Sequence, residues 1–149
     1  MKQRFKMKDV LPLAYDAMGA LEDFAKDSSI EPRHQELIRL RASQINGCAY
    51  CVNYHTNNAR KLGESEVRLS LVCVWKEAPS IFTEEEQLLL GMSEEVTLIH
   101  QNGLSDSLYK KSVAMFGEKK TAQIIMTIIA INVWNRASVA LHLQPEIDS

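Results

Sequence analysis

An all-α fold is predicted by three features of the sequence. Only six glycines and four prolines interrupt the 149 residues, and no extended segment alternates apolar and polar residues as a half-buried strand would. Apolar residues recur instead at helical spacing between turn and capping signals. The length suits one domain, and no repeat or linker divides it. We therefore expect residues 1–149 to form a single-domain helical bundle.

The first three helices are indicated by their apolar pattern and their ends. The first should span about 11–26, with an inner face formed by Leu13, Ala17, Ala20, Leu21 and Phe24. Pro32 suits the first turn of the second helix. Asn46-Gly47 is a turn signal before the third helix, which Gly63 can end in the left-handed conformation.

The second half of the chain predicts four more helices. Ser65 opens one, and Pro79 follows its expected end. Thr83 and Glu86 form a capping-box pattern at the start of the next. Asn102-Gly103 and Phe116-Gly117 break the chain again. The expected helices are 65–78, 83–100, 105–115 and 119–141.

The last of these helices leaves little of its circumference polar. Its apolar residues include Ile124, Ile125, Met126, Ile128, Ile129, Ile131, Val133 and Trp134. A helix apolar on nearly all sides is normally buried on all sides. In so small a domain we expect a second subunit to cover it, within a closed homo-oligomer.

Composition and charge narrow the class of partner. A net charge of -2 gives no electrostatic reason to bind nucleic acid or an anionic membrane. No apolar stretch approaches the roughly 20 residues that span a bilayer, and the basic start has no signal-peptide pattern. Three cysteines, two of them in one CxxC, argue against an extracellular disulfide framework. We expect a cytoplasmic protein without nucleic-acid or membrane partners.

The most informative motif is Cys48-Ala-Tyr-Cys51-Val-Asn-Tyr-His55. On a helix, spacings of three and four residues put both sulfurs and the imidazole on one face. The turn before the motif would place the cysteines in the first helical turn, where the macrodipole favours a thiolate. Two thiols beside a base are the parts that reversible disulfide chemistry needs, so the motif indicates a redox site.

The same motif is compatible with a zinc site or with a pair of core cysteines. Zinc could take its ligands from Cys48, Cys51 and His55, with Glu36, His34 or a water as the fourth. A thioredoxin-like site requires a βαβ context, and no strands are visible. The two cysteines could also be small buried core residues.

Two further residues have an ordinary structural interpretation when each is considered by itself. Glu36 lies among aliphatic residues and arginines, and by itself it would be a solvated partner of Arg33, Arg39 or Arg41. Cys73, in an apolar run without a second cysteine nearby, is expected to be a small buried hydrophobe.

The spacing Glu36, eleven residues, Cys48-x-x-Cys51, x-x-x-His55 resembles the signature of AhpD-like alkylhydroperoxidases in the carboxymuconolactone decarboxylase superfamily. Three further segments resemble the small single-domain members: Trp75-Lys-Glu-Ala-Pro, Phe82-Thr-Glu-Glu-Glu and Asn132-Val-Trp-Asn-Arg136. The resemblance extends over about residues 32–141. One departure is Tyr50, because the best-studied members carry a histidine between the cysteines, next to the second one.

The resemblance implies an all-helical fold, self-association into trimers or hexamers, and thiol-dependent reduction of hydroperoxides. It assigns Cys51 as the cysteine that reacts with peroxide and Cys48 as the one that resolves it. Glu36 and His55 would act as a proton relay. The substrate would be a hydroperoxide and the partner a dithiol reductant that the sequence does not identify, with no cofactor or metal.

Two competing functions follow from the same resemblance and motif. One is a carboxymuconolactone decarboxylase-type lyase, whose chemistry does not require the cysteine pair. The other is a non-catalytic oligomer that senses redox state or binds zinc. Retention of both Cys48 and Cys51 favours the thiol peroxidase over the lyase.

Overall fold

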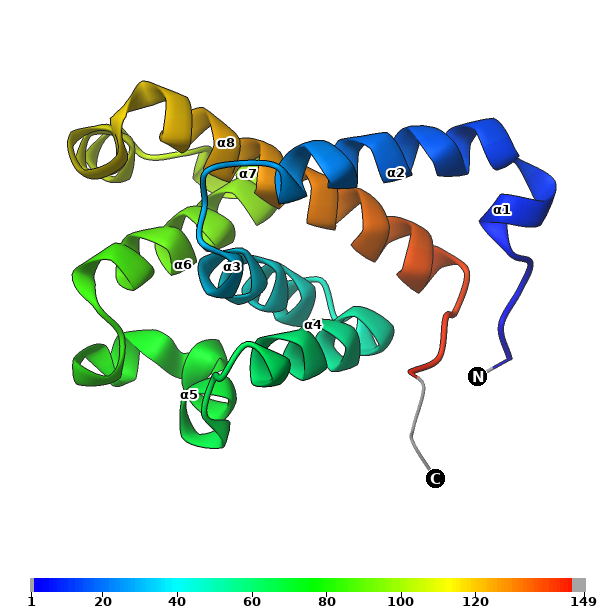
Figure 1. Ribbon diagram of the computed structural model, residues 1–149, viewed down its shortest axis with the longest axis horizontal. Coiled ribbons are helices and arrows are strands. Elements are labelled where there is room, and N and C mark those ends of the chain that lie inside the picture. The colour runs from blue at the N-terminus through cyan, green and yellow to red at the C-terminus, as the bar shows by residue number, and fades with distance from the viewer. Residues whose placement is uncertain (1, 146–149) are drawn as a thin grey trace.

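The computed structural model describes residues 2–145, and every regular element in that range is a helix (Figure 1). The α-helices and the two 3-10 helices are α1 (Met7–Val10), α2 (Pro12–Lys26), α3 (Pro32–Ile45), α4 (Ala49–Lys61), α5 (Glu66–Leu71), η1 (Val72–Glu77), η2 (Pro79–Ile81), α6 (Glu84–Thr97), α7 (Ile99–Asn102) and α8 (Asp106–Ala140). The predicted all-α class is confirmed. Helix α3 packs against α4, α6 and α8, and α8 also packs against α2 and α6. Among the residues described, no helix combines the length and the apolar character that a membrane span requires.

Local signals set several helix ends where the sequence predicted them. Pro32 occupies the first turn of α3, where its missing N–H costs nothing. Thr83 and Glu86 form the capping box of α6: Thr83 N donates to Glu86 Oε2 at 2.8 Å, and Glu86 N donates to Thr83 Oγ1 at 3.2 Å. Gly117, with φ 73°, interrupts the helical geometry inside α8. The predicted separation of 105–115 from 119–141 is therefore real.

Two predicted helices are not continuous. The helix expected over 65–78 ends at Leu71, and the chain continues as η1, inside which Val74 leaves the helical region. This irregular turn brings the indole Nε1 of Trp75 to 2.8 Å from Glu94 Oε1, a tertiary contact that no local signal encodes. The helix expected over 83–100 ends at Thr97, and a separate short helix, α7, follows.

The predicted inner face of α2 is wrong except at Leu21, which is partly buried. Leu13 is 82% exposed and Phe24 is 53% exposed, and Ala17 and Ala20 are exposed as well. The face that packs inward instead contains Ala14, Met18, Leu21 and Ala25. Both stripes have helical spacing, so the apolar pattern could not say which would meet α8.

Helix α8 is covered mainly by other parts of the same chain. Its Ile124, Ile128 and Ile131 are buried, and α2, α3 and α6 pack around it. Figure 1 shows α8 passing beneath α2 and beside α3. Ile129 keeps 39% of its surface exposed. Because α8 is already buried in this way, a second subunit is not needed to cover it.

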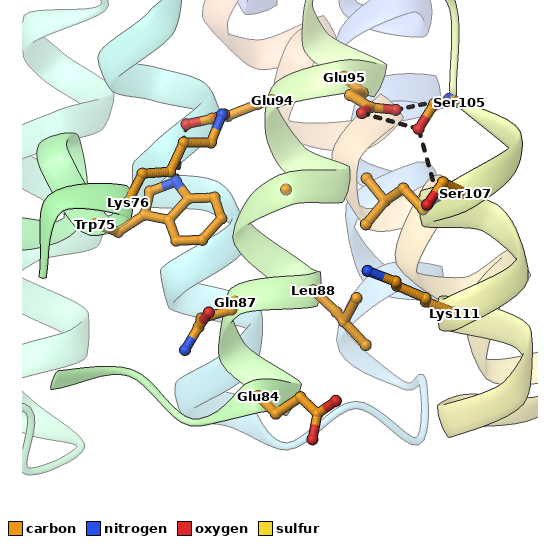
Figure 2. A pocket seen from close by; sticks show the side chains of 12 residues that line it. Trp75, Lys76, Glu84, Gln87, Leu88, Glu94, Glu95, Ser105, Ser107 and Lys111 are labelled. Atoms are coloured by element: carbon orange, nitrogen blue, oxygen red, sulfur yellow. Dashed lines mark hydrogen bonds and ion pairs between the residues drawn. The ribbon is translucent and has the colours of Figure 1, made fainter. Parts of the chain in front are cut away.

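Glu94 of α6 links η1 to α3. Its carboxylate accepts hydrogen bonds from Trp75 Nε1, from Lys76 Nζ at 2.6 Å and from Arg41 Nε at 2.9 Å. Figure 2 shows the Trp75 and Lys76 side chains converging on Glu94. Burial alone would raise the pKa of Glu94, but these donors outweigh burial and lower the pKa below its usual range. The stability that this network contributes is thus present near neutral pH and is lost on acidification through the lowered pKa.

Candidate redox-active site

Helices α3 and α4 bring together the four residues that the sequence singled out. Glu36 lies near the start of α3, Cys48 is the N-cap of α4, and Cys51 and His55 follow on α4. All four are buried or nearly so. Because α3 and α4 pack side by side, the carboxylate reaches the imidazole across the contact between the helices.

Cys48 and Cys51 form a disulfide. Gly47 has φ 65° and turns the chain, after which Cys48 caps α4: the backbone N–H of Cys51 donates to Cys48 Sγ at 3.2 Å. The unpaired N–H groups of a helix start carry partial positive charge. In the reduced state, the same position would stabilise a thiolate. The structure is therefore that of the oxidised state of a cysteine pair at a helix N-terminus.

A short hydrogen bond joins His55 to Glu36. His55 Nδ1 lies 2.7 Å from Glu36 Oε2. An ionised carboxylate only accepts hydrogen bonds, so the tautomer that fits an ionised Glu36 has the proton on Nδ1. The other ring nitrogen, Nε2, is then the one available as a base.

Cys51 and His55 line the same cavity, which has a volume of about 400 Å³. Helices α2, α3, α4 and α8 contribute its walls, and Cys48 is not among the lining residues. Four aromatic side chains form much of the wall: Tyr15, Tyr50, Tyr54 and Trp134. Tyr15 and Trp134 meet edge to face at 5.4 Å, and Tyr50 stacks with Tyr54 at 6.3 Å. The cavity thus places one sulfur, one imidazole and the Glu36 carboxylate beside an aromatic wall. Glu22, Asp23 and Lys26 of α2 add charged groups to its lining.

The structure also decides which arginine accompanies Glu36. Arg39 Nη1 lies 3.4 Å from Glu36 Oε1. Arg33 instead faces Glu64 at 3.9 Å, and Arg41 pairs with Glu94. Glu36 is therefore not a solvated surface carboxylate, since it is buried and contacts both His55 and Arg39.

The sequence missed the residues of the far wall. Tyr15 and Glu22 come from α2, and Trp134 and Ser138 come from α8. They lie far from the CxxC motif in the chain, and no local pattern connects them to it. The family resemblance of Asn132-Val-Trp-Asn-Arg136 was the one signal near this wall, and it carried no indication that Trp134 lines the cavity.

Neither His34 nor Cys73 belongs to the cavity beside α4. Within residues 2–145 no cluster of three or more His, Cys, Asp or Glu side chains is arranged to hold a metal ion. His34 lies instead beside Glu85 and Glu86, at 3.6 and 3.9 Å. Cys73 is exposed and free, because the irregular η1 turns it outward, and its Sγ lies 3.5 Å from Ser70 O. The expectation that Cys73 is a buried hydrophobe is wrong.

A second hollow of about 420 Å³ lies on the outer side of α6 (Figure 2). Its lining includes Trp75, Lys76, Glu94, Ser105 and Lys111. None of the four predicted site residues contributes to it. Of the four predicted site residues, Glu36, Cys51 and His55 line the cavity beside α4 instead.

Comparison with known proteins places this fold and motif in a family. The sequence pattern of the carboxymuconolactone decarboxylase family matches residues 12–93. The uncharacterised protein YdfG of Bacillus subtilis is 37% identical over 141 residues, which cover 95% of each chain. The chain therefore belongs to the carboxymuconolactone decarboxylase family.

Solved structures add that the fold is AhpD-like. A protein of unknown function from Agrobacterium tumefaciens, provisionally described as the antioxidant defence protein AhpD, has a TM-score of 0.94 and 39% identity, with 99% of this chain and 100% of that one covered. An uncharacterised peroxidase-related protein of Ralstonia eutropha, with an alkylhydroperoxidase AhpD core, has a TM-score of 0.80 and 17% identity. That match covers 94% of this chain and 74% of the other, and it shows the fold alone.

Proposed function

We propose that this protein is a thiol-dependent peroxidase that reduces organic hydroperoxides through Cys51 and Cys48. The observation that carries the proposal is the Cys48–Cys51 disulfide at the start of α4, one helical turn from a histidine that is hydrogen-bonded to a buried glutamate. The family's decarboxylase chemistry has no use for a cysteine pair, so the disulfide favours redox chemistry over the lyase. The same feature would also suit a redox sensor. Repeated catalytic turnover of peroxide would distinguish a peroxidase from such a sensor.

The proposed reaction uses Cys51 as the attacking group. The Cys51 thiolate attacks one oxygen of the hydroperoxide, the O–O bond breaks, and Cys51 becomes a sulfenic acid. The departing alkoxide takes up a proton and leaves as the alcohol. Cys48 then attacks the Cys51 sulfur, forming the disulfide and releasing water. An external dithiol, itself oxidised to a disulfide, restores the two thiols.

Cys51 is favoured as the attacking cysteine because it lines the cavity, whereas Cys48 does not. The Cys48 sulfur sits behind it at the helix cap, where it can reach the Cys51 sulfur. These placements support the same assignment of roles that the family resemblance implies.

The relay would move one proton. With Nδ1 donating to Glu36, His55 Nε2 can take the proton of the Cys51 thiol and return it to the alkoxide. Glu36 would orient the ring and stabilise its charged form. Neither step needs a metal or cofactor.

The cavity supports an organic substrate rather than hydrogen peroxide alone. A volume of about 400 Å³ is within the range of sites for small organic ligands, and hydrogen peroxide would fill little of it. The aromatic wall of Tyr15, Tyr50, Tyr54 and Trp134 suits an apolar, uncharged body attached to the peroxide group.

We further propose that residues 1–149 act as one cytoplasmic domain within a homo-trimer or homo-hexamer, without nucleic-acid or membrane partners. Residues 1 and 146–149 lie outside the part that the structure describes. The support for self-association is the exposed apolar stripe of α2, formed by Leu13, Ala17, Ala20 and Phe24. Exposed apolar stripes of this kind mark association surfaces.

The cysteine roles predict distinct outcomes for two substitutions. Cys51→Ser should abolish reduction of cumene hydroperoxide, because the attacking thiolate is lost. Cys48→Ser should still react once and leave Cys51 as a trapped sulfenic acid. Mass spectrometry after stoichiometric peroxide, with a sulfenic-acid reagent, measures both. Cys73→Ser is the matched control and should turn over like the wild type. Trapping at Cys48 in the Cys51→Ser variant that equals trapping at Cys51 in the Cys48→Ser variant would contradict the assignment of roles.

The relay predicts non-additive losses. His55→Ala should slow oxidation of Cys51 by about 100- to 10,000-fold, the usual cost of losing a general base. Glu36→Gln should also slow it while the helical circular-dichroism signal is kept. The double variant should be no slower than His55→Ala, since both residues act on one proton. Stopped-flow rates of the wild type, both single variants and the double variant test this. If the two losses multiply in the double variant, Glu36 acts independently of His55.

The aromatic wall predicts a substrate-dependent effect. Trp134→Ala should raise the KM for cumene hydroperoxide by roughly 3- to 10-fold, because an aromatic contact is worth about 0.5–1.5 kcal/mol. Reaction with hydrogen peroxide should change much less. Tyr109→Ala is the control, since Tyr109 is an exposed residue of α8 outside the cavity. Equal effects on both peroxides would argue that the wall does not contact the substrate.

The stripe on α2 predicts how assembly can be weakened. Multi-angle light scattering at micromolar concentration should give the mass of a trimer or hexamer for the wild type. Leu13→Glu combined with Phe24→Glu should shift the mass toward the monomer, because buried unpaired charges are costly. Val67→Glu, at an exposed apolar residue of α5, should leave the mass unchanged. A wild-type protein that is entirely monomeric would refute self-association.

A further inference from the structure

Arg39 is a buried arginine one helical turn after Glu36. It is 2% exposed, and its guanidinium contacts side chains from two helices. Nη1 donates to Gln35 Oε1 at 2.9 Å and lies 3.4 Å from Glu36 Oε1. Nη2 lies 3.1 Å from Glu22 Oε1 of α2. A chain of polar contacts thus runs from His55 through Glu36 and Arg39 to Glu22.

The contacts of Arg39 are not what stability alone would favour. Its Nε and Nη2 are buried and make no aligned hydrogen bond within the described residues. Burying a guanidinium that is incompletely satisfied is costly, and apolar residues often replace such buried ions without loss of stability. Local departures of this kind concentrate at functional sites. The position of Arg39 therefore calls for a role at the site next to it.

Glu36 is held at both of its oxygens. Oε2 accepts from His55 Nδ1 at 2.7 Å, and Oε1 faces Arg39 Nη1. A carboxylate held on both sides cannot rotate without losing a charge-assisted contact. Its fixed plane in turn fixes the orientation of the imidazole and keeps the proton on Nδ1.

We propose that Arg39, itself held by Glu22 of α2, is a positioning residue that acts on His55 through Glu36. Arg39 is not among the residues that line the cavity, so it acts without touching the substrate. Glu22 does line the cavity, and its ion pair with Arg39 links the α2 wall to α3. The kinetic part of this inference rests on the proposed peroxidase reaction.

Arg41 provides a matched control on the same helix. Arg41 is partly buried and, like Arg39, pairs with a glutamate of another helix. Its Nε and Nη2 lie 2.9 and 2.8 Å from Glu94 Oε1. Its partner lies outside the cavity. Loss of Arg41 therefore removes a comparable ion pair without disturbing Glu36.

The test compares the full-length reduced wild type with Arg39→Gln, Glu36→Gln, the double variant and Arg41→Gln. In ¹⁵N NMR of the histidine rings, the His55 signals should show Nδ1 protonated in the wild type and in Arg41→Gln. In Arg39→Gln they should move toward a mixture of tautomers. Cys51 oxidation by stoichiometric cumene hydroperoxide should slow on the order of 10-fold in Arg39→Gln, the low end of the loss seen when a residue that orients a metal-bound histidine is removed. Adding Arg39→Gln to Glu36→Gln should change the rate by less than about 2-fold, because the two residues act in one chain.

Unchanged His55 signals in Arg39→Gln, or a loss that multiplies with that of Glu36→Gln, would overturn the inference. If Arg39→Gln does not fold, Glu22→Gln gives a second route, because it leaves Arg39 in place but removes its anchor. The same shift of the His55 signals, smaller in size, is expected there, and its absence refutes the proposal. A wild type that does not react with hydroperoxide refutes the peroxidase, while the NMR comparison still decides the role of Arg39.

Discussion

The hydrogen bond between Glu36 Oε2 and His55 Nδ1 is the contact on which the rest of the site depends. It crosses from α3 to α4, so its 2.7 Å length requires these two helices to pack at one register. A shift of α4 by one residue would turn His55 and Cys51 to another face. The Asn46-Gly47 turn and the cap at Cys48 determine that register, because they fix where α4 begins.

Helix α2 contributes to the site in a different way. It supplies Tyr15 and Glu22 to the cavity wall and reaches α3 through polar contacts. Besides the Glu22–Arg39 ion pair, Gln35 Nε2 donates to Ile30 O at 3.0 Å in the segment that joins α2 to α3. These contacts hold the α2 wall of the cavity against α3. The opposite side of α2 keeps its apolar stripe exposed, so one helix serves both as a wall of the site and as a surface available for association.

The remaining helices hold α3 from behind. One apolar cluster, which includes Leu37, Leu40 and Leu90, packs α3 against α6, and another, which includes Ile38 and Ile124, packs it against α8. Glu94 adds a polar link to Arg41. With α3 held on these sides, the Glu36 carboxylate is presented toward α4 at low cost in conformational entropy. This rigidity is what the proposed relay through Glu36 and His55 requires.

The sequence by itself determined the helical class, most helix ends and the common face of Cys51 and His55, which line one cavity. Pro32, the Thr83–Glu86 capping box and Gly117 act through their own backbone neighbours, so their effects can be predicted locally. The tertiary structure alone decided which stripe of α2 is buried, where η1 departs from α-helical geometry and which arginine meets Glu36. It alone brought Trp134 and Tyr15 to the cavity. The reason is that these outcomes depend on how separate helices pack against one another, and an apolar or charged residue carries no local sign of which distant partner it will meet.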